Sequence, residues 1–117
     1  MIRIYGIRNC DTIKKTLNWF ASRQLDVDFV DYKKTPPDES LLRSWLTQLD
    51  WEQLVNKRGT TWRKLPDEQR EGITEASAIE LMIANPSLIR RPVVDHDGTL
   101  SVGFDEHHFS DRVALIR

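Results

Sequence analysis

One cysteine, Cys10, is the side chain in this 117-residue chain best suited to covalent chemistry. It follows an apolar run over residues 2–7 and precedes a helix-like segment that begins at Asp11. A thiol at a helix N-terminus lies close to unpaired backbone N–H groups and to the positive end of the helix dipole, which favour the thiolate. Arg8, Lys14 and Lys15 add positive charge nearby. The segment therefore predicts a nucleophilic thiol that attacks an oxidised sulfur or an oxyanion.

Because Cys10 is the chain's one cysteine, no disulfide can form within the chain. Ile13 stands where a Cys-x-x-Cys motif would carry its second thiol. An adduct on Cys10 must then be resolved by an external thiol. A lone thiol is typical of a reducing cytoplasm, where glutathione is the obvious candidate co-substrate. We therefore expect monothiol chemistry in a cytoplasmic protein.

Alternating and helical hydrophobic patterns predict the elements that position this thiol. Residues 2–7 and 28–32 predict two strands, and residues 11–23 predict a helix between them, capped by Asp11 or Thr12. A β-helix-β unit this short predicts parallel neighbouring strands. Further helices are predicted over 40–49, 51–55, 74–84 and 104–116, with a polar, basic loop over 56–64 and a strand pair over 93–95 and 100–103 joined at Asp97-Gly98. This order predicts an α/β, thioredoxin-like layout.

Composition predicts one soluble globular domain over residues 1–117. The net charge of −1 argues against a surface built for nucleic acid. The first residues lack the apolar core of a signal peptide, and no apolar run reaches membrane-spanning length. His96, His107 and His108 lack partners at metal-ligand spacing, so we expect no metal. We expect a monomer with a small-molecule or disulfide substrate, and neither nucleic acid nor a membrane as partner.

Four separated segments resemble the ArsC/Spx family, and within it the YffB branch. They are residues 5–15, 58–64, 89–92 and 102–104, and they span nearly the whole chain in order. The resemblance implies a thioredoxin-like fold, with a small mixed sheet, covering helices and an inserted helical subdomain.

The resemblance also implies roles for individual residues. Cys10 falls on the nucleophile position, and Arg58 and Arg91 fall on two arginine positions that bind the oxyanion in arsenate-reducing members. Pro92 matches a proline whose peptide bond is cis and that faces the thiol. Asn9 either donates to a bound anion or shapes the turn, and Arg8 is a further candidate cation. A third family arginine has no match, because residues 102–105 read Val-Gly-Phe-Asp.

Three functions follow as hypotheses. The first is a glutathione-dependent monothiol reductase that uses Cys10 as the nucleophile and needs no bound cofactor, with glutathione or glutaredoxin resolving the adduct. The second is a non-enzymatic regulator that binds RNA polymerase as Spx does, although the missing second cysteine excludes the Cys-x-x-Cys switch. The third is arsenate reduction proper, which the missing arginine weakens.

Overall fold

The computed structural model describes residues 1–116 and divides into two compact units. The first unit comprises Met1–Thr35 and the segment from Arg91 onward, and the second is Pro36–Arg90. The second unit is helical and is inserted between two parts of the first, as expected of an inserted helical subdomain.

The first unit is built on a four-stranded mixed sheet in the order β2-β1-β3-β4. Its strands are β1 (Ile2–Gly6), β2 (Val27–Asp31), β3 (Val93–His96) and β4 (Thr99–Val102). The central strand β1 runs parallel to β2 and antiparallel to β3, and β3 and β4 form an antiparallel hairpin. The predicted parallel pair and hairpin are both confirmed, with each strand end within one residue of its predicted position.

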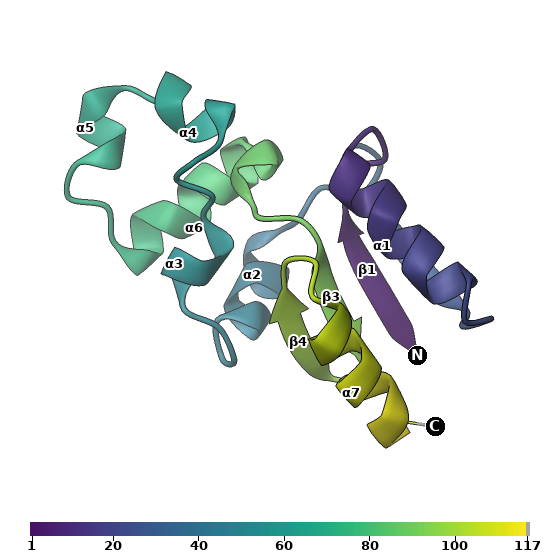
Figure 1. The fold of residues 1–117 in the computed structure, drawn as a ribbon. Coiled ribbons are helices and arrows are strands. Elements are labelled where there is room, and N and C mark those ends of the chain that lie inside the picture. The colour runs from purple at the N-terminus through teal and green to yellow at the C-terminus, as the bar shows by residue number, and fades with distance from the viewer. Residues whose placement is uncertain (117) are drawn as a thin grey trace. The chain divides into compact units, whose positions relative to one another are not determined.

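Helices α1 (Asp11–Ala21) and α7 (Glu106–Ile116) cover one face of this sheet (Figure 1). Both helices bury their apolar stripes against the residues of β1 and β3 that alternate toward that face. The resulting core contains Ile2, Ile4, Ile13, Trp19, Phe20, Val94, Phe109 and Val113. The β1–α1 connection leaves this core at the carboxyl end of β1, which is where Cys10 stands.

A two-residue turn joins β3 to β4 and confirms the predicted Asp97-Gly98 hairpin. Both turn residues have positive φ, 53° at Asp97 and 101° at Gly98. Positive φ at both central positions is the backbone that matches the twist of a hairpin, and glycine adopts it without strain. The amide of Gly98 also donates to the Asp95 carboxylate at 2.6 Å, which fixes the turn.

The second unit is made of short helices: α2 (Glu39–Trp45), α3 (Trp51–Leu54), α4 (Thr60–Lys64), α5 (Asp67–Arg70), α6 (Glu75–Ala84) and the 3₁₀ turn η1 (Pro86–Leu88). Asp38 caps α2 by accepting from Leu41 N at 2.8 Å. Thr74 and Ser77 form a capping box that starts α6. Within the described residues, no helix is long and apolar enough to span a membrane.

Two predictions for the second unit are wrong. Residues 60–64 form α4 rather than a loop, because Gly59 provides the N-cap and its carbonyl accepts from Arg63 N at 3.3 Å. Helix α2 ends at Trp45 rather than at residue 49. The next residues form tighter turns, in which Thr47 and Gln48 donate their amides to carbonyls three residues earlier.

Candidate active site

Cys10 is itself the N-cap of α1. Its backbone is extended, with φ −143° and ψ 126°, and its carbonyl accepts from Lys14 N at 3.0 Å. The expectation that Asp11 or Thr12 caps this helix is therefore wrong. No side chain at the N-cap accepts from the first-turn amides, which have no acceptor within the helix. Cys10 therefore carries its thiol at the end of α1 where backbone N–H groups have no partner within the helix.

The thiol is half-buried, and Cys10 packs against the core of the first unit. Arg8, Asn9 and Cys10 form a three-residue turn, closed by the Cys10 amide donating to Arg8 O at 3.0 Å. Asn9 is the central residue of this turn and its side chain is exposed. Asn9 thus shapes the turn through its backbone, and donation from its side chain to a bound anion stays a prediction.

Two cations close to Cys10 in the sequence are held over aromatic rings. The guanidinium carbon of Arg8 lies 4.9 Å from the ring centroid of Phe29, and Nζ of Lys15 lies 4.4 Å from that of Phe104. Both rings pack against the same core as Cys10. Such stacking restricts side chains that would otherwise move freely in solvent.

Gly6, the last residue of β1, allows Arg91 to approach the β1–α1 connection. A β-carbon at Gly6 would lie 3.9 Å from Cγ of Arg91 and 2.3 Å from Cδ1 of Ile13. The half-buried side chain of Arg91 therefore lies beside the end of β1, within the same unit as Cys10. Sequence spacing could not have predicted this, because 80 residues separate the two positions.

The Arg91-Pro92 peptide bond is cis, as the resemblance implied. Pro92 is buried, and its carbonyl accepts from Gly103 N at 2.8 Å. This bond ties the segment before β3 to the residue after β4. Asp105, two residues later, accepts from His108 N at 3.1 Å, so its carboxylate caps α7.

Tyr32 is a buried neighbour of this site that sequence reasoning missed. Its amide donates to Gly6 O at 2.9 Å, and its side chain is 3% exposed. Its hydroxyl has no hydrogen-bond partner among the described residues. Burial raises the pKa of Tyr32, the nearby Tyr5 adds to that rise, and the positive charge of Arg91 opposes it. Tyr32 therefore keeps its proton at neutral pH.

Arg58 belongs to the second unit and is exposed. Its amide donates to the Asn56 side chain at 3.1 Å, just before α4 begins. Cys10, Arg8, Asn9, Arg91 and Pro92 all belong to the first unit, in which Arg91 lies beside the end of β1. A role for Arg58 beside Cys10 stays a prediction.

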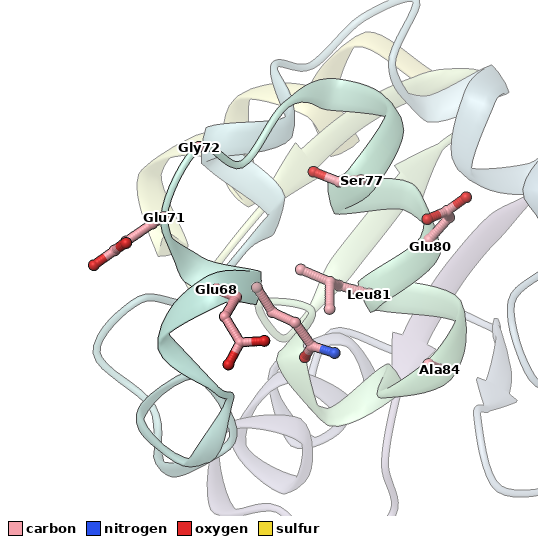
Figure 2. Close-up of a pocket in the computed structure, with 8 residues that line it drawn as sticks. Glu68, Glu71, Gly72, Ser77, Glu80, Leu81 and Ala84 are labelled. Atoms are coloured by element: carbon pink, nitrogen blue, oxygen red, sulfur yellow. The ribbon is translucent and has the colours of Figure 1, made fainter.

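A pocket of about 400 Å³ lies wholly within the second unit, between α5 and α6. Leu81 points into it, whereas the carboxylates of Glu71 and Glu80 point away (Figure 2). None of the predicted site residues lines it. Residues 1–116 contain no group of three or more His, Cys, Asp or Glu side chains that could hold a metal ion.

The fold and the cysteine-bearing turn define a thioredoxin-like α/β protein with one thiol at the start of its first helix. The chain belongs to the ArsC family, whose sequence model matches residues 5–111. An uncharacterised protein of Haemophilus influenzae is 39% identical over 93% of this chain and 96% of its own length. The global transcriptional regulator Spx of Streptococcus pyogenes is 26% identical over 91% of this chain and 80% of its own length.

Solved structures agree with this assignment. The YffB protein matches with a TM-score of 0.92 and 40% identity over 96% of this chain and 98% of its own. An arsenate reductase (ArsC) related protein from Brucella melitensis matches with a TM-score of 0.77 and 46% identity, over 94% of this chain and 92% of its own. The expected family and the thioredoxin-like fold are confirmed.

Proposed function

We propose that this protein is a glutathione-dependent monothiol reductase that uses Cys10 as its nucleophile. The observation that carries the proposal is the place of the thiol: Cys10 is the N-cap of α1, half-buried, with no side-chain group competing for the first-turn amides. Cations at Arg8, Arg91 and Lys15 occupy the same unit. Membership of a family with arsenate-reductase-like relatives supports thiol-dependent reduction.

The proposed cycle has two exchanges. The Cys10 thiolate attacks the glutathione sulfur of a mixed disulfide, forming a Cys10–glutathione disulfide as the original S–S bond breaks and the electron pair leaves with the substrate thiolate. A second glutathione thiolate then attacks the glutathione sulfur on Cys10. Glutathione disulfide is released and the Cys10 thiolate is restored. The net change is that the mixed disulfide is reduced to the substrate thiol while one glutathione thiol is oxidised, because the other half of the glutathione disulfide comes from the mixed disulfide itself.

The arginines have separate parts in this cycle. A guanidinium binds a carboxylate or an oxyanion with two parallel N–H donors, which an ammonium cannot do. Arg91, beside the end of β1, is the proposed first contact for the anionic group of the substrate. Arg58 is the proposed second contact.

The test is mass spectrometry of reduced protein exposed to glutathione disulfide. We expect one glutathione on Cys10 within minutes, slower modification in Arg58→Ala, and normal modification in the control Arg63→Ala, which removes an exposed arginine of α4. Turnover of a glutathionylated peptide should be lost in Cys10→Ser. Turnover that survives in Cys10→Ser would refute the proposal.

A regulator that docks RNA polymerase is the second candidate, favoured by the match to Spx. A pull-down with the polymerase α subunit separates the two functions. Binding by Cys10→Ser protein, without peptide turnover by the wild type, would favour the regulator. Arsenate reduction is the third candidate, supported by the putative arsenate reductase of Yersinia pestis, which is 26% identical with a TM-score of 0.81. Resistance conferred on an arsenate-sensitive host would support it.

A further inference from the structure

Two cation–aromatic pairs lie on opposite sides of the strand that leads to Cys10. Phe29 is on β2, which borders β1 on one side. Phe104 follows β4, and β3 and β4 lie on the other side of β1. Arg8 stacks on the first ring and Lys15 on the second. Cys10 and these two partly buried rings pack against the same core.

Both cations are available to a ligand. Arg8 and Lys15 are exposed, and within residues 1–116 neither forms an ion pair with a carboxylate. Lys14, the neighbour of Lys15, is equally exposed but has no ring beneath it in the described structure. The rings therefore fix two specific positive charges, one toward each side of β1, whereas no ring holds Lys14 within the described residues.

We infer that Arg8 on Phe29 and Lys15 on Phe104 determine substrate specificity, by selecting disulfides that carry a carboxylate on each side of the sulfur–sulfur bond. The inference deepens the proposed function and rests on it for the identity of the nucleophile. A carboxylate near each sulfur is attracted to the cation on its side, and the thiolate is then placed against the bond. A neutral disulfide gains nothing from either pair, and a cationic disulfide is repelled.

The selection follows from charge and distance. One unit charge a few ångströms away in water changes a rate by about threefold, and the effect weakens as salt screens it. Two such charges give a preference of about tenfold for a dianionic over a neutral disulfide at low ionic strength. Ring stacking adds to this because a fixed cation loses less conformational entropy on binding.

The experiment measures the single-turnover reaction of Cys10 with three small disulfides: dianionic dithiobis(nitrobenzoate), neutral dithiodipyridine and cationic cystamine. The readout is the ratio of the dianionic to the neutral rate constant, divided by the same ratio for free glutathione. This normalisation removes differences in reagent reactivity, and changes in thiolate content cancel because both reagents meet the same thiol.

Arg8→Gln and Lys15→Gln should each lower the normalised ratio about threefold, and the double variant about tenfold. Phe104→Leu removes the ring but keeps the charge of Lys15, so it should lower the normalised ratio by less than Lys15→Gln does. Lys14→Gln is the matched control and should change it less than twofold. A ratio unaffected by Arg8→Gln and Lys15→Gln, or lowered equally by Lys14→Gln, would overturn the inference.

Failure of this inference can be distinguished from failure of the proposed function. The single-turnover assay needs Cys10 as a nucleophile but needs no catalytic cycle with glutathione. If the wild-type protein does not turn over the glutathionylated peptide but its normalised ratio still depends on Arg8 and Lys15, the reductase is refuted and the charge selectivity stands. Peptide turnover together with a normalised ratio that Arg8→Gln and Lys15→Gln leave unchanged would support the reductase and refute the selectivity.

Discussion

Gly6 and Ile13 are in such close contact that no side chain fits between them. A β-carbon on Gly6 would lie 2.3 Å from Cδ1 and 2.8 Å from Cγ1 of Ile13, distances that real β-carbons do not adopt. Ile13 is fully buried in the core of the first unit, so its side chain has little room to withdraw. The contact sets how closely α1, and with it Cys10, lies against β1.

Gly6→Ala should therefore destabilise the protein by about 1–3 kcal/mol, the usual cost of overpacking a core. The measurement is the free energy of unfolding from urea denaturation. Ile13→Ala removes both clashing carbons, so Gly6→Ala should cost much less in that background, although Ile13→Ala alone is destabilising. Equal costs in the two backgrounds would show that this contact does not constrain the β1–α1 connection.

Tyr32→Phe removes a hydroxyl that is buried beside Arg91 and has no partner among the described residues. An unsatisfied buried polar group costs free energy, so its removal should leave the free energy of unfolding unchanged or raise it by up to about 1 kcal/mol. Urea denaturation measures this directly. A loss of more than about 1 kcal/mol would mean that the hydroxyl does have a stabilising partner.

The sequence predicted the sheet and the place of the thiol because both depend on local patterns. Alternating apolar residues predicted the strands, and the Asp97-Gly98 turn predicted the hairpin. The neighbours of the thiol depend instead on contacts distant in sequence. Nothing local to Phe29 or Phe104 predicts that each ring supports a cation, and nothing local to Tyr32 predicts a buried hydroxyl near Arg91.

The surroundings of the histidines likewise depend on contacts that local sequence patterns do not predict. His107 and His108 are adjacent at the start of α7, and His107 is exposed. His108 instead turns its ring toward His96, with ring centroids 5.7 Å apart. His96 is fully buried, and its polar contact is Ser101 Oγ at 3.4 Å from Nε2.

This burial predicts a pH dependence of stability. Burial, with smaller contributions from the nearby His108 and Arg112, lowers the pKa of His96 from 6.5 to about 4, while Asp95 opposes the shift. Between these values the unfolded chain binds a proton that the folded protein excludes. The contribution of His96 to the free energy of unfolding is therefore complete above pH 6.5. It is lost as the pH falls toward 4, by up to about 1.4 kcal/mol per pH unit.

The measurement is urea denaturation at several values of pH across this range. His96→Gln, which cannot titrate there, should flatten the dependence, whereas the control His107→Gln should leave it unchanged. A profile identical in wild type and His96→Gln would show that other groups cause any acid destabilisation.

Arg91 and Arg90 are adjacent in sequence, yet they belong to different units and are expected to differ in function. Arg91→Ala removes the guanidinium beside the end of β1 and should slow glutathionylation of Cys10 about tenfold, the loss expected of one charged hydrogen bond. Arg91→Lys keeps the charge but not the paired donors, so it should recover part of the rate. Arg90→Ala, the exposed neighbour, should react like wild type. Mass spectrometry of quenched time points measures all four proteins, and equal rates for Arg91→Ala and Arg90→Ala would exclude Arg91 from substrate binding.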